Sequence, residues 1–493
     1  MRVGFDNEKY IQMQAEHIRS RIDQFGGKLY LEFGGKLFDD YHAARVLPGF
    51  EPDSKIRMLK QLADDVEIIV AISANDIEKS KVRGDLGITY DEDTLRLLDI
   101  FRSMGFATSG VVITHYANQP SAVAFRHRLD ALGIKSYLHY PIPGYPYDLP
   151  RIVSDEGYGK NEYVETTHPL VVVTAPGPGS GKMATCLSQL YHEHERGVEA
   201  GYAKYETFPI WNLPLKHPVN IAYEAATVDL DDANTIDPFH LEAYGETTVN
   251  YNRDVEIFPV LKAMMEKISG ESPYQSPTDM GVNMAGMAIV DDDAVREAAK
   301  MEIVRRYFQA AVELQRTGVG EEQVQRLELL MNQAGVDASY SPARSAALLK
   351  EEMTGAPAGA MVLPDGTVVT GKTSNLLGAA SSLIMNALKG VAGVDEDLYV
   401  ISNEVIEPIC RLKTDTLHSK NPRLHSDETL LALSVSSATD PLAKKLIDAA
   451  GKLRGCDAFF SVIISAPDEK LYRTLGINVC CEPKYEQRRY FHR

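Results

Sequence analysis

The stretch LVVVTAPGPGSGKMAT, residues 170–185, decides the fold class of this chain. Its first four residues are aliphatic, which is typical of a strand that is buried on both faces of a sheet. Glycine and proline then interrupt the pattern, and a segment with the spacing of a helix begins near Gly181. A buried strand that passes through a glycine turn into a helix is the unit from which parallel α/β sheets are built.

The turn in this stretch predicts a phosphate-binding loop. Glycines let the backbone curl until successive N–H groups point at one centre, and the helix N-terminus adds its positive dipole end. Lys182 stands where the lysine of a P-loop meets the β- and γ-phosphates of a nucleotide. We predict a catalytic role for Lys182, and we predict these cofactor-binding residues: Gly177, Gly179, Ser180, Gly181, Lys182, Met183 and Thr185.

The loop departs from the standard string G-x-x-x-x-G-K-[ST] at two positions. Pro176 replaces the first glycine, and Met183 replaces the Ser or Thr that would ligate Mg²⁺. Thr185, Ser180 or Thr174 is the alternative source of that hydroxyl. A tight turn whose glycines serve packing alone is the competing interpretation.

A second segment, GTVVTGKT at residues 366–373, matches the string formally. Its interior is β-branched, which resists the positive φ angles of a phosphate cradle. The preceding LPDG at 363–366 is a turn signal between two alternating runs, so we predict a β-hairpin here. Residues 371–374 are expected to open a helix.

Strand and helix patterns alternate through the first half of the chain, which predicts a mostly parallel sheet with flanking helices, of the P-loop or Rossmann kind. The predicted strands are 28–33, 66–73, 110–115, 136–140, 170–174 and 220–225, and the predicted helices between them include 54–64, 93–104 and 120–132. The second half predicts helices at 294–317, 321–333, 342–353, 374–388, 427–434 and 441–453, and strands at 360–363, 367–370, 459–464 and 477–481. We therefore predict an α/β phosphate- or nucleotide-binding domain at 1–290, a helical connector at 291–340 and a smaller α/β domain at 341–493.

Composition excludes several classes of protein. The net charge of −18 disfavours a nucleic-acid partner, because neutralising phosphates over a broad face needs clustered Lys and Arg. No apolar run has the length of a signal peptide or a membrane span. The odd count of five cysteines, with no C-x-x-C spacing, fits reduced thiols. We expect a cytoplasmic protein without a membrane partner, and self-association as a homo-oligomer is retained as an open alternative.

Acidic and histidine residues supply the remaining candidates. Asp229 and Asp291 each follow an apolar run, where a carboxylate could hold the Mg²⁺ of a nucleotide, although such positions are also ordinary turns or helix caps. His418 and His425 lie in a polar stretch and are candidate acid–base catalysts. The competing interpretation is a solvated loop.

Several strings together resemble a conserved bacterial family of functionally uncharacterised proteins of about 500 residues, over the full chain. They are residues 31–36 (LEFGGK), 174–182, 186–193 (CLSQLYHE), 278–283 (TDMGVN), 363–366, 371–374 and 475–479 (LGINV). The resemblance implies a bacterial, cytosolic protein and carries no catalytic residue with it.

The combined hypothesis is a nucleotide-binding enzyme that uses ATP and Mg²⁺ on a degenerate P-loop, as a hydrolase, ligase or transferase. One alternative is an enzyme that acts on a phosphorylated metabolite without hydrolysing a nucleotide, which the methionine at position 183 favours. The other is a non-catalytic assembly or regulatory protein. In the first two cases the partner is a small phosphate-bearing ligand.

Overall fold

The chain folds into two compact units in the computed structural model, which describes residues 2–35, 37–38, 40–83 and 86–486. The N-terminal unit comprises Val3–Tyr223 and Asp231–Val295. The C-terminal unit comprises the described chain from Arg296 onward, together with the inserted segment Glu224–Leu230. The three-part division drawn from the sequence at residues 290 and 340 stays a prediction.

A seven-stranded parallel sheet forms the centre of the N-terminal unit, in the order β11-β8-β1-β7-β2-β5-β6. Its strands are β1 (Leu29–Phe33), β2 (Val66–Ser73), β5 (Ala107–Thr114), β6 (Ser136–Leu138), β7 (Leu170–Thr174), β8 (Gly201–Tyr205) and β11 (Gly281–Val282). Two small antiparallel ribbons accompany it: β3 (Val82–Arg83) with β4 (Ile88–Thr89), and β9 (Asn234–Ile236) with β10 (Val249–Tyr251). The predicted α/β class and the parallel sheet are confirmed.

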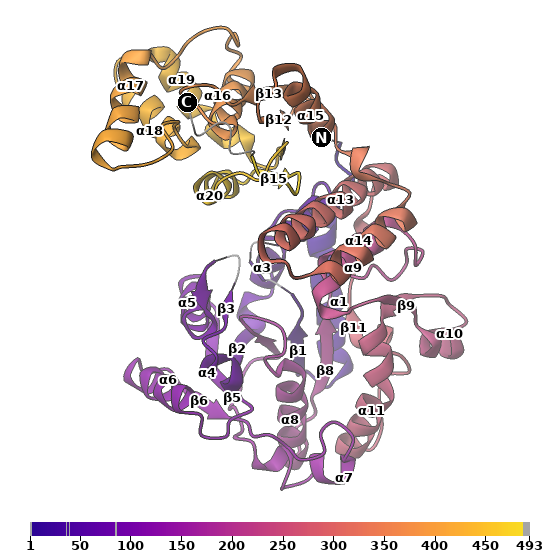
Figure 1. Cartoon of the computed structure of the whole chain (residues 1–493). Helices are drawn as coiled ribbons and strands as arrows, with labels where there is room; N and C mark the ends of the chain where they lie inside the picture. Colours follow the sequence, from indigo (N-terminus) through magenta and orange to yellow (C-terminus); the bar gives the residue numbers. More distant parts are fainter. Residues whose placement is uncertain (1, 36, 39, 84–85, 487–493) are drawn as a thin grey trace. The chain divides into compact units, whose positions relative to one another are not determined.

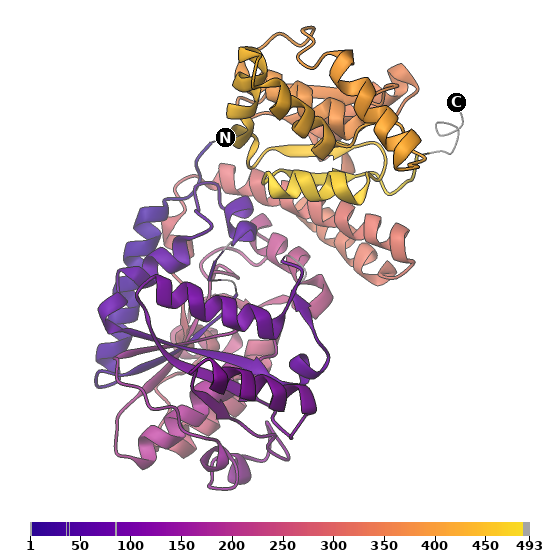
Figure 2. The same cartoon turned by 90° about the vertical axis from the view of Figure 1, so that its left-hand side faces the viewer.

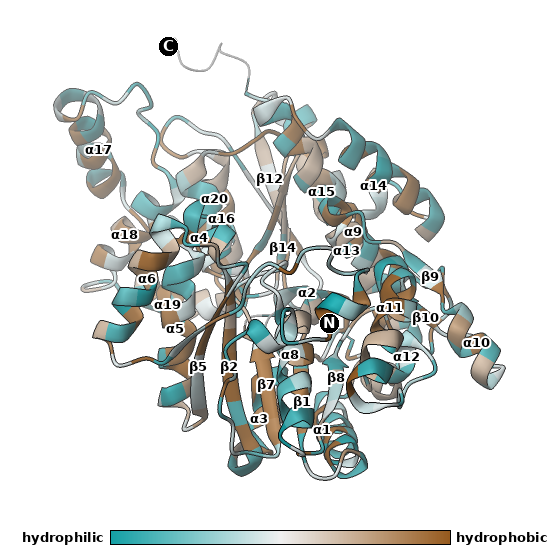
Figure 3. Ribbon diagram, turned by 90° about the horizontal axis from the view of Figure 1, so that it is seen from below, coloured by the Kyte–Doolittle hydropathy of each residue, from teal (hydrophilic) through white to brown (hydrophobic). Residues whose placement is uncertain are grey.

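Strands β2 and β7 are the hydrophobic centre of this sheet. Every residue of both is buried, and the structure gives them the bounds that the sequence predicts. Figure 3 shows β5, β2 and β7 side by side in brown, the apolar end of the scale. Such strands lack an alternating pattern because helices cover both faces of a parallel sheet.

The described part of the N-terminal half also contains helices α1 to α12, several of which flank this sheet (Figure 1). They are α1 (Asn7–Gln24), α2 (Tyr41–Val46), α3 (Ser54–Lys60), α4 (Ala74–Glu78), α5 (Tyr90–Ser103), α6 (Pro120–Ala131), α7 (Leu149–Ile152), α8 (Lys182–Glu195), α9 (Pro218–Ala226), α10 (Pro238–Tyr244), α11 (Asn252–Ser269) and α12 (Pro277–Met280). The core under α8 and α11 joins Val171 and Val173 of the sheet to Cys186, Leu187 and Phe258.

The predicted strand at 220–225 is wrong, because this segment is part of helix α9. Its buried residues Val219, Ala222 and Ala225 recur at a spacing of three, which is the spacing of one helix face. Pro218 at the start of the helix was the available signal, since proline is favoured in the first turn. Asn220 faces inward and holds the preceding loop through Ile210, whose N–H donates to it at 2.8 Å.

The C-terminal unit contains a four-stranded mixed sheet in the order β13-β12-β14-β15. Its strands are β12 (Ala358–Val362), β13 (Val368–Lys372), β14 (Asp457–Phe460) and β15 (Asn478–Cys481). The helices are α15 (Pro342–Thr354), α16 (Ala379–Ala392), α17 (Asn403–Arg411), α18 (Ser426–Ser436), α19 (Pro441–Asp448) and α20 (Ala466–Thr474). The predicted smaller α/β region is confirmed, and Figure 2 shows α20 and the last strands in yellow.

The formal P-loop match at 366–373 is a hairpin, as predicted. Strands β12 and β13 pair antiparallel, and the N–H of Leu363 donates to the carbonyl of Thr367 across the turn. The expected helix at 371–374 is wrong, because Gly371 and Lys372 belong to β13 and α16 begins only at Ala379. Backbone pairing with β12 uses the groups that a helix start would have left free.

Two long helices form the middle of the chain, α13 (Asp292–Thr317) and α14 (Glu321–Ala334). They lie side by side, as Figures 1 and 2 both show, and Tyr307 of α13 donates to Glu328 of α14 at 3.5 Å. The predicted helical middle is therefore confirmed.

No helix within the described ranges is both long enough and apolar enough to cross a bilayer.

Substituting Asn220→Ala should lower the free energy of unfolding by about 2 kcal/mol, because it leaves the buried N–H and C=O of Ile210 without partners. The urea midpoint of unfolding measures this loss. Asn332→Ala, at an exposed position of α14, is the matched control and should unfold like the wild type. Equal midpoints for both variants would contradict the anchoring role of Asn220.

Candidate functional site

Neighbouring strands β1 and β7 send the chain to opposite faces of the sheet. Tyr30 of β1 donates to Glu193 of α8 at 2.6 Å, so α8 covers the face on which Tyr30 lies. Phe33 points to the opposite face of the sheet, where its ring stacks on that of Tyr205 with centres 4.0 Å apart. Lys55 of α3 lies over the Tyr205 ring on that face. Strand β1 therefore leads to α3 on one face, whereas β7 leads to α8 on the other. In open α/β sheets such a switch point is where ligands bind, beyond the carboxyl ends of the strands.

The predicted glycine loop lies at this switch point, between the end of β7 and the start of α8. Gly179 and Gly181 have φ angles of 73° and 80°, a region that residues with a Cβ rarely adopt. Gly181 is also the N-cap of α8 and supplies no side chain to the helix end. The N-terminal amides of α8 are therefore left to another partner.

Contacts with neighbouring strands fix the shape of the loop. The Thr114 hydroxyl, at the end of β5, donates to the carbonyl of Ser180 at 2.9 Å. A Cβ on Gly181 would lie 3.0 Å from Thr114, and a Cβ on Gly177 would overlap the ring of Tyr90. Both glycines are thus required by the close approach of neighbouring residues.

Consecutive amides in this loop have no acceptor in the part of the protein that the structure describes. Within the described residues, the N–H groups of 179–184 donate to neither backbone nor side chain. Lys182 is partly buried and likewise has no hydrogen bond or ion pair there. Burial lowers the pKa of Lys182, Glu32 opposes this shift and Lys204 adds to it. An unpaired cation beside unpaired amides is an arrangement that an anion would satisfy.

The hydroxyls around Met183 are used internally. Thr185 donates to the carbonyl of Gly181 at 2.9 Å, and Ser180 donates to that of Gly177 at 2.8 Å. Both side chains are completely buried. Neither hydroxyl is therefore available to ligate Mg²⁺ in place of the Ser or Thr that Met183 replaces. Of the three alternative hydroxyls, that of Thr174 remains.

His115 is a site residue that sequence reasoning missed. It follows β5 directly, and its Nδ1 lies 3.2 Å from the hydroxyl of Thr114, the residue that holds the loop. Its φ of 53° is unusual for a residue with a side chain and marks a position under backbone strain. Burial lowers the pKa of His115. A lone histidine after a strand gave no signal in the sequence, because only the fold brings it beside the glycine loop.

A charged cluster occupies the end of β8, on the other side of β1. Lys204 forms ion pairs with Glu206, at 2.7 Å, and with Asp254 of α11. Burial raises the pKa of Glu206 to about 8, where Asp254 adds to the shift and Lys204 opposes it. Glu32 of β1 accepts a hydrogen bond from Tyr202 at 2.7 Å and lies close enough to affect both Lys182 and Lys204. Charges therefore extend continuously from the glycine loop across β1 to β8.

Comparison with known proteins places the chain in a family. A model described as "Domain of unknown function DUF1846, N-terminal" matches residues 3–335, and its C-terminal counterpart matches residues 339–491. The chain belongs to the DUF1846 family. It is 59% identical over 492 residues to a UPF0371 protein of Corynebacterium diphtheriae, covering 100% of this chain and 99% of that one. It is 54% identical over 490 residues to a UPF0371 protein of Streptococcus pneumoniae, covering 99% of each. The resemblance to an uncharacterised bacterial family is thus confirmed.

The other predicted residues of this DUF1846 chain belong to other elements than the glycine loop. Asp291 caps α13, where it accepts from the N–H of Ala294 at 3.2 Å. Asp229 lies in the 3₁₀ turn Val228–Leu230, which belongs to the C-terminal unit, as do His418 and His425. Within the described ranges, His, Cys, Asp and Glu form no group of three that could hold a metal ion. The roles assigned to these residues stay predictions.

His425 joins the starts of two helices in the C-terminal unit. Its Nδ1 lies 3.1 Å from a carboxylate oxygen of Asp468 in α20, and that oxygen also accepts from Ser465 at 2.6 Å. The second oxygen accepts from the N–H and the hydroxyl of Ser426, both at 2.7 Å. The hydrogen bond to Asp468 raises the pKa of His425, although burial opposes it. The arrangement orients the imidazole and ties α18 to α20.

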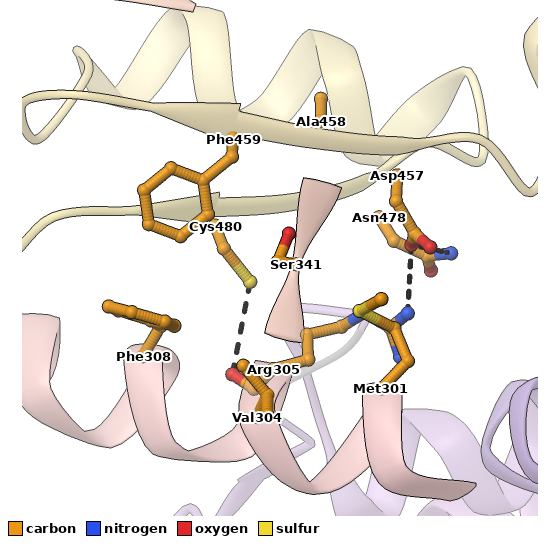
Figure 4. Close-up of a pocket in the computed structure, with 10 residues that line it drawn as sticks. All are labelled: Met301, Val304, Arg305, Phe308, Ser341, Asp457, Ala458, Phe459, Asn478 and Cys480. Atoms are coloured by element: carbon orange, nitrogen blue, oxygen red, sulfur yellow. Dashed lines mark hydrogen bonds and ion pairs between the residues drawn. The ribbon is translucent and has the colours of Figure 1, made fainter. Parts of the chain in front are cut away.

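A small pocket in the C-terminal unit is lined by an ion pair (Figure 4). Arg305 of α13 is buried and reaches Asp457 of β14 at 2.8 Å, and it also pairs with Glu302. Cys480 of β15 points to the backbone carbonyl of Arg305 at 3.8 Å. Because each charge is matched within the protein, these contacts hold α13 on the small sheet.

Two glycine substitutions should distinguish the cost of backbone strain from the cost of steric contact with Thr114. Gly179→Ala and Gly181→Ala both place a Cβ at positive φ, which costs about 1–2 kcal/mol each. Only Gly181→Ala also crowds Thr114, since a Cβ at Gly179 meets nothing within 4 Å. Chemical denaturation should therefore show the larger loss of stability for Gly181→Ala. Equal losses would contradict the described contact with Thr114.

Stability should depend on pH through His425. A raised folded-state pKa means that the contribution of His425 is complete below its unfolded pKa of about 6.5 and is lost as the pH rises through the folded value. The free energy of unfolding of the wild type should thus fall more steeply above about pH 6.5 than that of His425→Gln. Urea titrations across this range measure the difference. His418→Gln, at an exposed position, should retain the wild-type slope, and a matching slope in His425→Gln would refute the assignment.

Proposed function

We propose that this protein binds a phosphate-bearing ligand, foremost a nucleotide, on the loop at residues 174–185 and acts on it as an enzyme. The unpaired amides of residues 179–184 beside the unpaired Lys182 carry this proposal. These amides lie at a helix N-terminus, where a bound anion would accept from them and gain from the helix dipole.

The position of the loop supports the same proposal. It lies at the switch point between β1 and β7, and the dipole of α8 points its positive end at the site. Lys55 approaches from the opposite face, where it forms a 2.7 Å ion pair with Asp40 and lies beside Gly35. Burial opposes this ionised state, but Lys55 and the N–H of Ala43 outweigh it and lower the pKa of Asp40. Lys55 thereby lies beside two residues that follow β1, Gly35 and Asp40.

Mg²⁺ in its usual P-loop position does not fit the residues present. Met183 offers no hydroxyl, and Thr185 and Ser180 donate within the loop. Any role of Asp229 or Asp291 as a ligand would need those carboxylates to face the same phosphate. We therefore derive no step through a metal, and charge neutralisation is assigned to Lys182 and the loop amides.

The second candidate function is an enzyme for a phosphorylated metabolite that hydrolyses no nucleotide. The internal use of both replacement hydroxyls favours it, since ATP-hydrolysing P-loops use that position to hold the metal. A panel of nucleotides and sugar phosphates, with and without Mg²⁺, separates the two candidates by thermal shift. Stabilisation by nucleotides alone would reject this second candidate.

Removing the Lys182 amine should weaken phosphate binding by about 10–100-fold, because a hydrogen bond between charged groups is worth about 1.5–3 kcal/mol. Calorimetric titration of ADP and of inorganic phosphate into the wild type and Lys182→Ala measures this. The control is Lys372→Ala, the exposed lysine of the formal match at 366–373, which should leave affinity unchanged. Equal affinity of the wild type and Lys182→Ala would remove the basis of the proposed function.

A further inference from the structure

The end of β8 combines aromatic faces with buried carboxylates. Phe208 stacks on Tyr223 with ring centres 5.5 Å apart, and Tyr223 in turn lies 5.3 Å from Tyr251. His42, from α2 after the β1 loop, completes the group at 5.4 Å from Phe208. Lys204 lies over the Tyr251 ring at 5.5 Å, which joins the aromatic group to the charged cluster.

Glu206 has a buried oxygen without a hydrogen-bond donor. The side chain is 5% exposed, and its Oε1 lies 2.7 Å from Nζ of Lys204 but outside hydrogen-bond geometry. The ammonium is directed to Asp254, with which it forms its hydrogen bond. The ion pair with Lys204 offsets the charge of this oxygen, but its lone pairs accept no hydrogen bond of good geometry from the described residues, so it retains the capacity to accept one.

Electrostatic interactions connect the aromatic group and the charged cluster at β8 to Lys182 of the glycine loop. Glu206 acts electrostatically on both Tyr223 and Tyr251, and Lys204 acts on both Tyr223 and Lys182. The ends of β8 and β7 are separated by β1 alone, which corresponds to two strand spacings, about 10 Å. A phosphate on the loop and a small ring at β8 can belong to one molecule across this span.

We propose that the end of β8 is a sugar subsite, in which Glu206 and Asp254 accept hydrogen bonds from hydroxyl groups while a ring face packs on the Tyr223–Tyr251–Phe208 group. The inference rests on the proposed function, because the phosphate of the same ligand occupies the glycine loop. Sugars offer both features at once, donors at their edges and C–H groups on their faces, which match buried acceptors and aromatic rings respectively. The ligand class is therefore a phosphorylated sugar, either free or as the ribose phosphate of a nucleotide.

Three probes test this subsite by calorimetric titration: inorganic phosphate, glucose 6-phosphate and AMP. At least one of the two sugar phosphates should bind the wild type about tenfold more tightly than inorganic phosphate, since the sugar hydroxyls add hydrogen bonds to the carboxyl groups of Glu206 and Asp254. Tighter binding of AMP would identify the ligand as a nucleotide, and tighter binding of glucose 6-phosphate would identify it as a free sugar phosphate. Glu206→Gln should abolish the gain and leave the affinity for inorganic phosphate within twofold, because Lys182 is untouched.

Tyr223→Leu provides a second variant, which removes a ring face and leaves the carboxylates in place. It should also lose the gain for the sugar phosphates while it retains inorganic phosphate. Near-UV circular dichroism of the ligand-free variants establishes that each is folded. Survival of the full gain in both variants, or its absence in the wild type, overturns the subsite. If inorganic phosphate itself fails to bind the wild type, the proposed function fails first.

Discussion

Parallel pairing of β1 with β7 is the constraint on which the rest of the N-terminal unit depends. The pairing brings together residues that are far apart in the sequence, such as Glu32 of β1 and Val173 of β7. Because each strand must lead to a helix on a covered face, β1 turns to one side of the sheet and β7 to the other. The two glycine-containing loops that follow are consequently neighbours, although neither pattern alone indicates the other.

The charges at this edge follow from the same geometry. A buried lysine such as Lys204 is tolerated because Asp254 and Glu206 surround it, and these contacts raise its pKa although burial opposes them. Lys182 differs, since burial lowers its pKa and no carboxylate touches it among the described residues. One lysine is thus neutralised within the protein, whereas the other retains its capacity for an external anion.

Local pattern predicted much of this fold, and the failures have physical causes. Strands β2 and β7 were found at their exact bounds because a continuous aliphatic run between breakers admits few alternatives. The segment at 220–225 was misassigned because a short apolar run fits a strand and a buried helix equally well. Within the candidate site, the sequence pattern alone predicts the glycine loop and Lys182. It does not predict His115 or Glu206, because their positions relative to the loop depend on strand pairing that the sequence does not reveal.

The inserted segment Glu224–Leu230 has a consequence for how this protein can be divided. It leaves the N-terminal unit between Tyr223 and Asp231 and contributes the turn Val228–Leu230, which packs against α14, to the C-terminal unit. The backbone therefore passes from one unit to the other more than once, and no single cut of the chain yields both intact. A fragment that stops at Val295 would carry this turn without the helix that covers it. The C-terminal unit is thus completed by residues from within the N-terminal part of the chain, and a fragment that begins at Arg296 would lack them.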